Sequence, residues 1–278
     1  MNVLSLFDGM SCGQIALNRV GIKYDNYYAS EVDKHSIKVT QHNYPNTIQL
    51  GDITQINGSD LPKINLLFGG SPCQGFSFAG KQLNFEDSRS KLFFEFVRLK
   101  DELNPRYFLL ENVKMKKEYS DIITKYLGVE PILINSNLVS AQNRERLYWT
   151  NIPNVTIPDD KKIFVKDILD YDTEHKKLSD KTIKKHFFYI KNYTPTGKSP
   201  TLTTELAHGT GKNITPKCHY EIKNITNEDR VFSPLECERL QTVPDNYTSV
   251  VSNTQRFKML GNGWTVDIIA HIFKKIIE

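Results

Sequence analysis

Residues 2–43 read NVLSLFDGMSCGQIALNRVGIKYDNYYASEVDKHSIKVTQHN. Apolar runs at 2–7 and 24–30 predict strands, and segments of helical periodicity follow them at 12–20 and 34–43. This strand–helix alternation is typical of an α/β fold, in which a mostly parallel sheet is covered by helices on both faces. The stretch therefore decides the fold class.

The alternation continues along the chain. The strands expected next lie at 47–50, 64–68 and 106–110, with a closing pair at 132–137 and 146–150. The helices expected next lie at 91–103, 119–127, 233–241 and 265–277. The helix at 233–241 has a cap residue in Ser233, Pro234 in its first turn and Glu236 at its third position.

Composition narrows the class of protein. The 278 residues carry a net charge of +4, and no apolar stretch nears the roughly 18 residues of a membrane span. The start, MNVLSLFDG, has no basic region and predicts no signal peptide. The four cysteines form no Cys-x-x-Cys pair, so we expect neither a zinc site nor a disulfide framework. An intracellular, reduced protein is expected.

Residues 155–225 differ from the rest. They hold 13 lysines, no arginine and nine acidic residues, which accounts for the whole net charge of +4. Weak periodicity and scattered turn signals predict a smaller domain of loops and short strands. Its lysines form either a solvated surface or one that meets phosphates. Without arginine, bidentate recognition of guanine by Arg from inside this region is excluded.

The run GGSPCQGFS at 69–77 follows the apolar run 64–68. The glycines end the strand, and Pro72 fixes its own φ and restricts Ser71. The Cys73 thiol then emerges at a strand end, where open α/β sheets place their ligands. By itself the run fits either a nucleophilic thiolate or an ordinary loop cysteine.

A second group of residues has the spacing of a nucleoside site. FDGMSCG at 7–13 joins the first strand to the first helix, Glu31 ends the second strand and Asp52 ends the third. A carboxylate at the end of the second strand can hold a ribose diol. One at the end of the third strand can accept a hydrogen bond from an adenine amino group. The absence of Gly-x-Gly-x-x-Gly disfavours a dinucleotide. Turn glycines and helix-capping acids are the alternative interpretation.

Taken in order, these motifs resemble those of the DNA (cytosine-5)-methyltransferases, over nearly the whole chain outside 155–225. The similar segments are FDG (7–9), SPCQ (71–74), ENV (111–113), QNRER (142–146), 230–244 with RLQ (239–241), and GNGW (261–264). The last segment, with Gly263 and Trp264, is closer to animal de novo methyltransferases. The catalytic loop follows the bacterial form.

The resemblance implies a class I methyltransferase, Rossmann-like fold and transfer of a methyl group from S-adenosyl-L-methionine to carbon 5 of a flipped cytosine in a specific double-stranded DNA sequence. Cys73 would attack carbon 6 of the base. Glu111 would hold or donate a proton at ring nitrogen 3 and contact the exocyclic amine, a role that burial beside the apolar run 108–110 favours. Arg144 would stabilise the base at its carbonyl, and Arg146 would do similar work or hold phosphate.

The remaining cofactor residues follow from the same resemblance, whereas the nucleic-acid residues between 155 and 225 follow from the lysine-rich character of that region. The cofactor residues are Phe7, Asp8, Gly9, Met10, Ser11, Glu31, Val32, Asp52, Ile53, Asn262, Gly263 and Trp264. The nucleic-acid residues are Gln74, Gly75, Ser77, Arg89, Lys184, Lys185, Lys198 and Thr203. The segment from Gly75 to Arg89 would close over the flipped base.

The expected organisation is a catalytic domain, residues 1–154 and 256–278, and a target-recognition domain, residues 155–255. We expect a cytoplasmic bacterial or phage enzyme that is a monomer, without a metal or a membrane partner. Three alternatives stay open: a tRNA cytosine-5 methyltransferase, a non-catalytic nucleic-acid-binding relative, and a nucleotide-dependent enzyme of unrelated chemistry.

Overall fold

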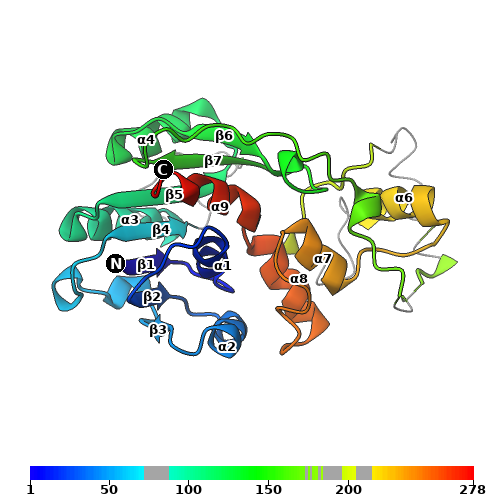
Figure 1. The fold of residues 1–278 in the computed structure, drawn as a ribbon, viewed down its shortest axis with the longest axis horizontal. Helices are drawn as coiled ribbons and strands as arrows, with labels where there is room; N and C mark the ends of the chain where they lie inside the picture. The colour runs from blue at the N-terminus through cyan, green and yellow to red at the C-terminus, as the bar shows by residue number, and fades with distance from the viewer. Residues whose placement is uncertain (72–87, 173–174, 176, 181–182, 184–195, 205–214) are drawn as a thin grey trace. The chain divides into compact units, whose positions relative to one another are not determined.

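The computed structural model describes the chain except for residues 72–87, 173–174, 176, 181–182, 184–195 and 205–214. Among the described residues, seven strands form one sheet in the order β3-β2-β1-β4-β5-β7-β6 (Figure 1). The strands are β1 (Asn2–Leu6), β2 (Asn26–Ser30), β3 (Ile48–Gln49), β4 (Leu66–Gly70), β5 (Tyr107–Val113), β6 (Ile132–Asn135) and β7 (Glu145–Thr150).

The sheet is mostly parallel, as predicted. β1 pairs in parallel with β2 and β4, β2 with β3, and β4 with β5. β7 runs antiparallel to β5. The carboxyl ends of the five parallel strands therefore lie along one edge of the sheet, which is where open α/β folds bind ligands.

Helices follow most strands. The α-helices among the described residues are α1 (Cys12–Arg19), α2 (Lys34–Asn43), α3 (Ser88–Leu103), α4 (Lys117–Leu127), α6 (Thr215–Thr226), α7 (Pro234–Leu240), α8 (Asn253–Asn262) and α9 (Val266–Lys274). Short 3₁₀ turns include η1 (Ile53–Gln55), η2 (Gly58–Asp60), η4 (Ser136–Leu138) and η5 (Val165–Asp167).

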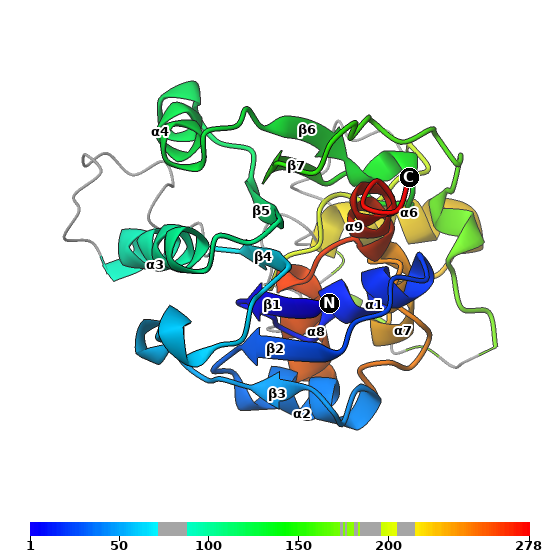
Figure 2. The same ribbon diagram turned by 60° about the vertical axis from the view of Figure 1, so that its left-hand side comes forward.

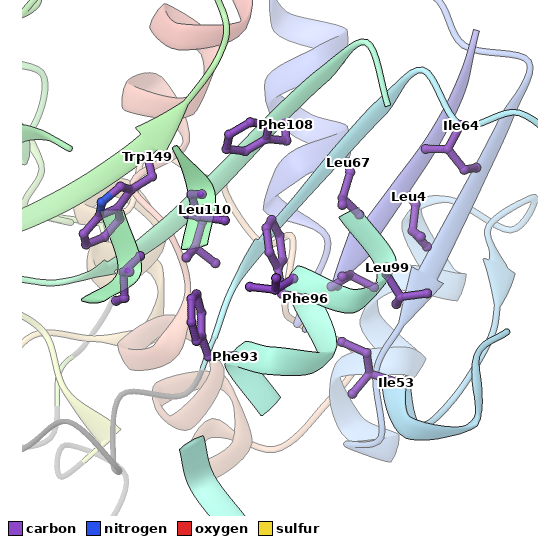
Figure 3. Close-up of a cluster of buried hydrophobic side chains, with 14 of the residues drawn as sticks. Leu4, Ile53, Ile64, Leu67, Phe93, Phe96, Leu99, Phe108, Leu110 and Trp149 are labelled. Carbon is purple, nitrogen blue, oxygen red and sulfur yellow. The ribbon is translucent and has the colours of Figure 1, made fainter. Parts of the chain in front are cut away.

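One face of the sheet packs against α3 and α4. Strand positions two apart share a face, so Leu4, Leu67 and Leu110 project together. They form a buried cluster with Phe93 and Phe96 of α3 (Figure 3). On the same face, the indole Nε1 of β7 donates to a hydroxyl of α4, at 3.0 Å between Trp149 and Thr124.

The opposite face packs against α1. Phe68 alternates with Leu67 and points away from α3; its ring centroid lies 6.1 Å from that of Tyr27 and 5.2 Å from that of Phe273. A Cβ at Gly13 of α1 would lie 2.3 Å from the Phe68 ring, so only glycine permits this approach. Helices therefore cover both faces, as predicted (Figure 2).

The chain divides into two compact units. The first comprises residues 1–134, 145–157 and 270–278, and the second comprises residues 135–144 and 158–269. The first contains the parallel strands; the second contains α6, α7 and α8. The division into catalytic and target-recognition domains at 154/155 and 255/256 stays a prediction.

Several elements differ from those expected. Residues 215–226 form α6, not loops or short strands, and α8 was not predicted. β5 extends through Asn112 and Val113, which pair with Leu147 and Arg146 of β7, so Glu111 lies inside the strand. β3 ends at Gln49, and Asp52 instead precedes η1. α7 begins as predicted, with Ser233 and Glu236 forming a capping box.

Candidate active site

The loop after β1 has a strained backbone. Phe7 and Ser11 adopt φ angles of 58° and 64°, in the left-handed region that residues with a side chain seldom occupy. The backbone N–H of Gly9 donates to Oε2 of Glu31 at 2.7 Å, which ties the loop to the end of β2. Such strain persists only where surrounding contacts enforce it, and it is concentrated at ligand sites.

Glu31 is fixed in place and retains acceptor capacity. Its Oε1 accepts from the backbone N–H groups of Val32 and Asp33, each at 2.7 Å, in addition to the bond at Oε2. A carboxylate offers about four lone-pair sites, so at least one is left for a hydroxyl donor. This geometry fits the ribose role expected of Glu31.

Val32 and Asp52 were also predicted to contact the nucleoside. The Val32 side chain is 71% exposed, which is unusual for a large apolar residue. Asp52 uses Oδ1 to accept from Thr54 at 2.9 Å, and Oδ2 accepts from no described residue. Ile53, which follows Asp52 in the chain, is buried and belongs to the core cluster. An exposed apolar side chain and an unused carboxylate oxygen are the groups that an adenine ring and its amino group would need.

The Asp8 side chain points into the protein interior. The Tyr27 hydroxyl donates to its Oδ1 at 2.7 Å, and Oδ2 is buried without a hydrogen-bond partner. Burial raises the pKa of Asp8 to about 6, although hydrogen bonds from Ser5 and Tyr27 partly oppose the rise. The Asp8 side chain thus anchors the loop to the protein interior, and the Asp8 backbone is part of the loop.

Glu111 and Arg146 form an ion pair on neighbouring strands. Arg146 Nε lies 2.9 Å from Glu111 Oε1, with the two side chains 13% and 10% exposed. Glu111 is opposite Tyr148, and Arg146 is opposite Val113, so the pair is a diagonal contact on one face of the sheet. A carboxylate and a guanidinium are therefore held together near the carboxyl end of β5.

Asn112, on the other face of β5, was not predicted as a site residue. Its Nδ2 donates to Oγ of Ser71 at 3.1 Å and to the Ser71 carbonyl at 3.4 Å. Ser71 is the last described residue before the segment that contains Cys73. Asn112 thus fixes the start of that segment, and its place between Glu111 and Val113 in the motif was the available signal.

Arg144 has a different environment from Arg146. It is 3% exposed, and its guanidinium donates to the carbonyls of Leu202, Gly261 and Gly263 at 3.0, 3.3 and 2.9 Å. Every one of these contacts lies within the second unit. Arg144 therefore holds backbone segments of the second unit together, whereas Arg146 pairs with Glu111.

The loop containing Asn262, Gly263 and Trp264 is held by buried hydrogen bonds, including those from Arg144. Gln241, which was quoted in a motif but not predicted as a site residue, donates to the carbonyls of Leu260 at 2.7 Å and Gly263 at 3.2 Å. A Cβ at Gly261 would lie 2.4 Å from the Thr203 backbone, so glycine is required there. The loop shape is set by buried polar contacts from separate segments.

Lys198 was expected to contact nucleic acid, but its ammonium group is occupied. It donates to the carbonyls of Asn137 at 2.7 Å, Ser140 at 3.1 Å and Ile163, and it lies 4.9 Å from the Phe164 ring centroid. Burial lowers the pKa of Lys198. An ammonium has three donors, and all three are used here, so none is left for a phosphate.

Most of the other residues predicted to contact nucleic acid, and Cys73, lie outside the described part of the chain. Cys73, Gln74, Gly75, Ser77, Lys184 and Lys185 lie outside the described residues, as does the side chain of Arg89 at the start of α3. Thr203 is described and lies against Gly261. Within the described part of the chain there is no cluster of three or more residues suited to a metal ion. None of its helices has the length and apolar character needed to cross a membrane.

Residues 1–278 match the family described as C-5 cytosine-specific DNA methylase. The chain belongs to this family. Type II methyltransferase M1.ScrFI of Lactococcus lactis subsp. cremoris is 31% identical over 304 residues, covering 99% of this chain and 78% of the relative. Type II methyltransferase M.HhaI of Haemophilus parahaemolyticus is 28% identical, covering 98% of this chain and 93% of the relative.

The fold comparison agrees. The Entamoeba histolytica methyltransferase EhMeth superposes with a TM-score of 0.78 at 17% identity, covering 100% of this chain and 99% of that one. The predicted class I methyltransferase fold is confirmed, and so is the predicted enzyme class, a DNA (cytosine-5-)-methyltransferase. Members of this family use S-adenosylmethionine and a covalent cysteine mechanism.

Proposed function

We propose that this methyltransferase acts on a cytosine flipped out of a specific double-stranded DNA sequence, through a covalent adduct with Cys73. The observation that carries the proposal is a register: Gly70, three residues before Cys73, is the partner of Glu111 on the neighbouring strand. Glu111 in turn pairs with Arg146. A nucleophile, an acid and a guanidinium are thus supplied from adjacent strand ends.

Each group has a defined task. The Cys73 thiolate adds to carbon 6 and makes carbon 5 nucleophilic. Negative charge then develops in the ring, and a proton held by Glu111 at nitrogen 3 relieves it. Arg146 keeps Glu111 in position and stabilises the charge at the base carbonyl. Loss of the carbon-5 proton after methyl transfer releases Cys73.

S-adenosylmethionine supplies an electrophilic methyl group. In our proposal the strained loop from Phe7 to Ser11, including Met10, binds its amino-acid part, and Glu31 accepts from its ribose. Val32, Asp52 and Ile53 form the adenine site. By the family resemblance we also assign Asn262, Gly263 and Trp264 to the cofactor; Arg144 and Gln241 hold the backbone of that loop.

DNA recognition is assigned to residues 155–255. Flipping costs a few kcal/mol, and contacts from Gln74, Gly75, Ser77 and Arg89 would offset that cost. Lys184, Lys185 and Thr203 would meet the DNA, whereas we assign Lys198 to the internal structure of the second unit. We further propose that the enzyme is a metal-free cytoplasmic monomer of bacterial or phage type.

The test is methyl transfer in vitro. Purified enzyme, labelled S-adenosylmethionine and plasmid DNA should give label in DNA, and bisulfite sequencing should place it at cytosines of one sequence. Cys73→Ser should abolish transfer, with Cys12→Ser, a buried thiol outside the mechanism, as the matched control. Label in tRNA but not in DNA would overturn the proposed substrate.

A second measurement isolates the covalent step. A duplex carrying 5-fluorocytosine should trap the wild-type protein as an adduct that survives denaturing electrophoresis, because fluorine blocks loss of the carbon-5 substituent. Glu111→Gln should bind DNA but form this adduct far more slowly. Normal adduct formation by Cys73→Ser would exclude the mechanism.

A further inference from the structure

Asp8 carries a buried carboxyl oxygen for which the mechanism has no use. Its Oδ1 accepts from Tyr27 at 2.7 Å, while Oδ2 is buried and makes no hydrogen bond. Buried polar groups are nearly always paired, and an unpaired charged oxygen is costly. The group therefore needs either a proton or a positive charge nearby.

Among the described residues, the groups that interact with Asp8 do not supply that charge. Tyr27 faces Asp8 from β2, Glu31 follows β2, and Tyr24 and Tyr44 interact with it from the segments before β2 and after α2. Glu31 acts against ionisation of Asp8 by repulsion. The more distant Cys12 and Arg19 of α1 act on Tyr44.

The Asp8 backbone places this group at the cofactor loop. Its N–H donates to the Ser30 carbonyl at 3.1 Å, its carbonyl accepts from the Ser11 N–H at 3.0 Å, and its neighbour Gly9 bonds Glu31. Asp8 is thus adjacent in the chain to the residues that we assign to the methyl donor. In a buried site, charges are weakly screened.

We propose that Asp8 is a specificity-determining residue that favours the cationic methyl donor over the uncharged thioether product. S-adenosylmethionine carries a sulfonium charge, and S-adenosylhomocysteine, which remains after transfer, has lost it. The Asp8 carboxylate is stabilised by the first ligand and not by the second. The inference rests on the proposed cofactor site and adds a means of product release to it.

A proton linkage follows. With a pKa of about 6, Asp8 is partly protonated in the free protein at pH 6, because burial disfavours the carboxylate. Binding of the sulfonium cation favours the carboxylate, so a proton leaves to solvent. Binding of the neutral thioether releases none. Affinity for the donor therefore rises with pH between 5 and 7, whereas affinity for the product stays level.

Isothermal titration calorimetry of the full chain tests this. Both ligands are titrated at pH 5, 6 and 7, and at pH 6 in two buffers that differ in ionisation enthalpy, which measures the protons released. We expect the donor-to-product affinity ratio of the wild type to rise about tenfold between pH 5 and pH 7. A tenfold change corresponds to a difference of about one pKa unit between free and donor-bound Asp8. Asp8→Asn should give a level ratio and release no protons.

Two variants keep the test decisive. Tyr27→Phe keeps the acid and removes a bond that stabilises its charge, so the midpoint of the rise should move to higher pH even if Asp8→Asn folds poorly. Asp101→Asn, an exposed acid of α3, should behave as the wild type. A pH-independent wild-type ratio, or an unchanged rise in Asp8→Asn, would refute the inference. If the wild type binds neither ligand, the proposed cofactor site itself is wrong.

Discussion

Arg144 and Arg146 are two residues apart, yet their surroundings predict opposite consequences for the same substitution. Replacing each with lysine keeps the charge and removes the planar fork of donors. Arg144→Lys should lower stability with a smaller direct effect on chemistry. Arg146→Lys should leave stability almost unchanged and lower turnover.

The magnitudes follow from the contacts. Arg144 donates to three buried carbonyls, and a lysine ammonium cannot span all three from one position. A hydrogen bond to a charged group contributes about 1.5–3 kcal/mol, and since such losses are not additive we expect about 2–3 kcal/mol in total. In Arg146→Lys the new ammonium would still pair with Glu111, so a loss of less than about 1 kcal/mol is expected there. Losing a donor aimed at developing charge costs about 100-fold in kcat.

The assay has two readouts. Urea unfolding followed by circular dichroism gives the change in unfolding free energy, and single-turnover methyl transfer at saturating DNA, on the folded fraction, gives the rate. A chain of this size should lose about 2 °C of Tm per kcal/mol. A stable Arg144→Lys enzyme with abolished transfer, beside an Arg146→Lys enzyme of normal rate, would show that Arg144 and not Arg146 contacts the base.

Three other substitutions test individual contacts. Gly13→Ala puts a Cβ 2.3 Å from the buried Phe68 ring and should lower the free energy of unfolding, measured in urea, by about 1–3 kcal/mol. An unchanged free energy would mean that α1 lies farther from the sheet. Lys198→Met should lower the unfolding midpoint but leave the salt dependence of DNA binding unchanged, and a slope reduced by about one would make Lys198 a phosphate contact. The pKa of Asp8 in the folded protein is about 6, above its ordinary 3.8, so the fold favours the protonated acid. The free energy of unfolding should therefore fall by up to about 3 kcal/mol as the pH rises from about 4 to about 6. Asp8→Asn should lack that fall in urea titrations without ligand, and retaining it would assign the titration to another group.

The strand and helix pattern was readable because local periodicity and core packing agree in the first unit. The helix predicted at 34–43 has the observed bounds, and the predicted core strands differ by only a few residues at their ends. β5 was predicted too short because Asn112 and Val113 are held by β7, more than 30 residues away. Local sequence carries no signal for such a partner.

α6 was missed for a related reason. Its sequence, TPKCHYEIKNIT, is rich in residues of modest helix propensity. The helix has a tertiary anchor: Glu221 is fully buried and accepts from the backbone N–H groups of Thr196 at 2.7 Å and Gly197 at 3.1 Å. A buried carboxylate with partners 25 residues earlier cannot be inferred from periodicity.

Lys198 shows the same limit for site residues. In sequence it is one of 13 lysines between 155 and 225, and nothing distinguishes it from Lys184 or Lys185. Its contacts with the carbonyls of Asn137 and Ser140 arise about 60 residues away. Charge counting identifies a basic region, but only packing shows which charges remain available to DNA.

The QNRER motif illustrates why one motif can serve two purposes. Residues 135–144 belong to the second unit and residues 145–157 to the first, so the chain passes from one unit to the other between Arg144 and Glu145. Arg144 precedes β7 and donates to carbonyls of its own unit, whereas Arg146 lies within β7 and follows the strand alternation toward Glu111. Residues two apart in a strand share a face, but this rule ends where the strand ends. The resemblance implied a base contact for Arg144 and either similar work or a phosphate contact for Arg146. The start of β7 between them explains why Arg144 donates to loop carbonyls and Arg146 pairs with Glu111.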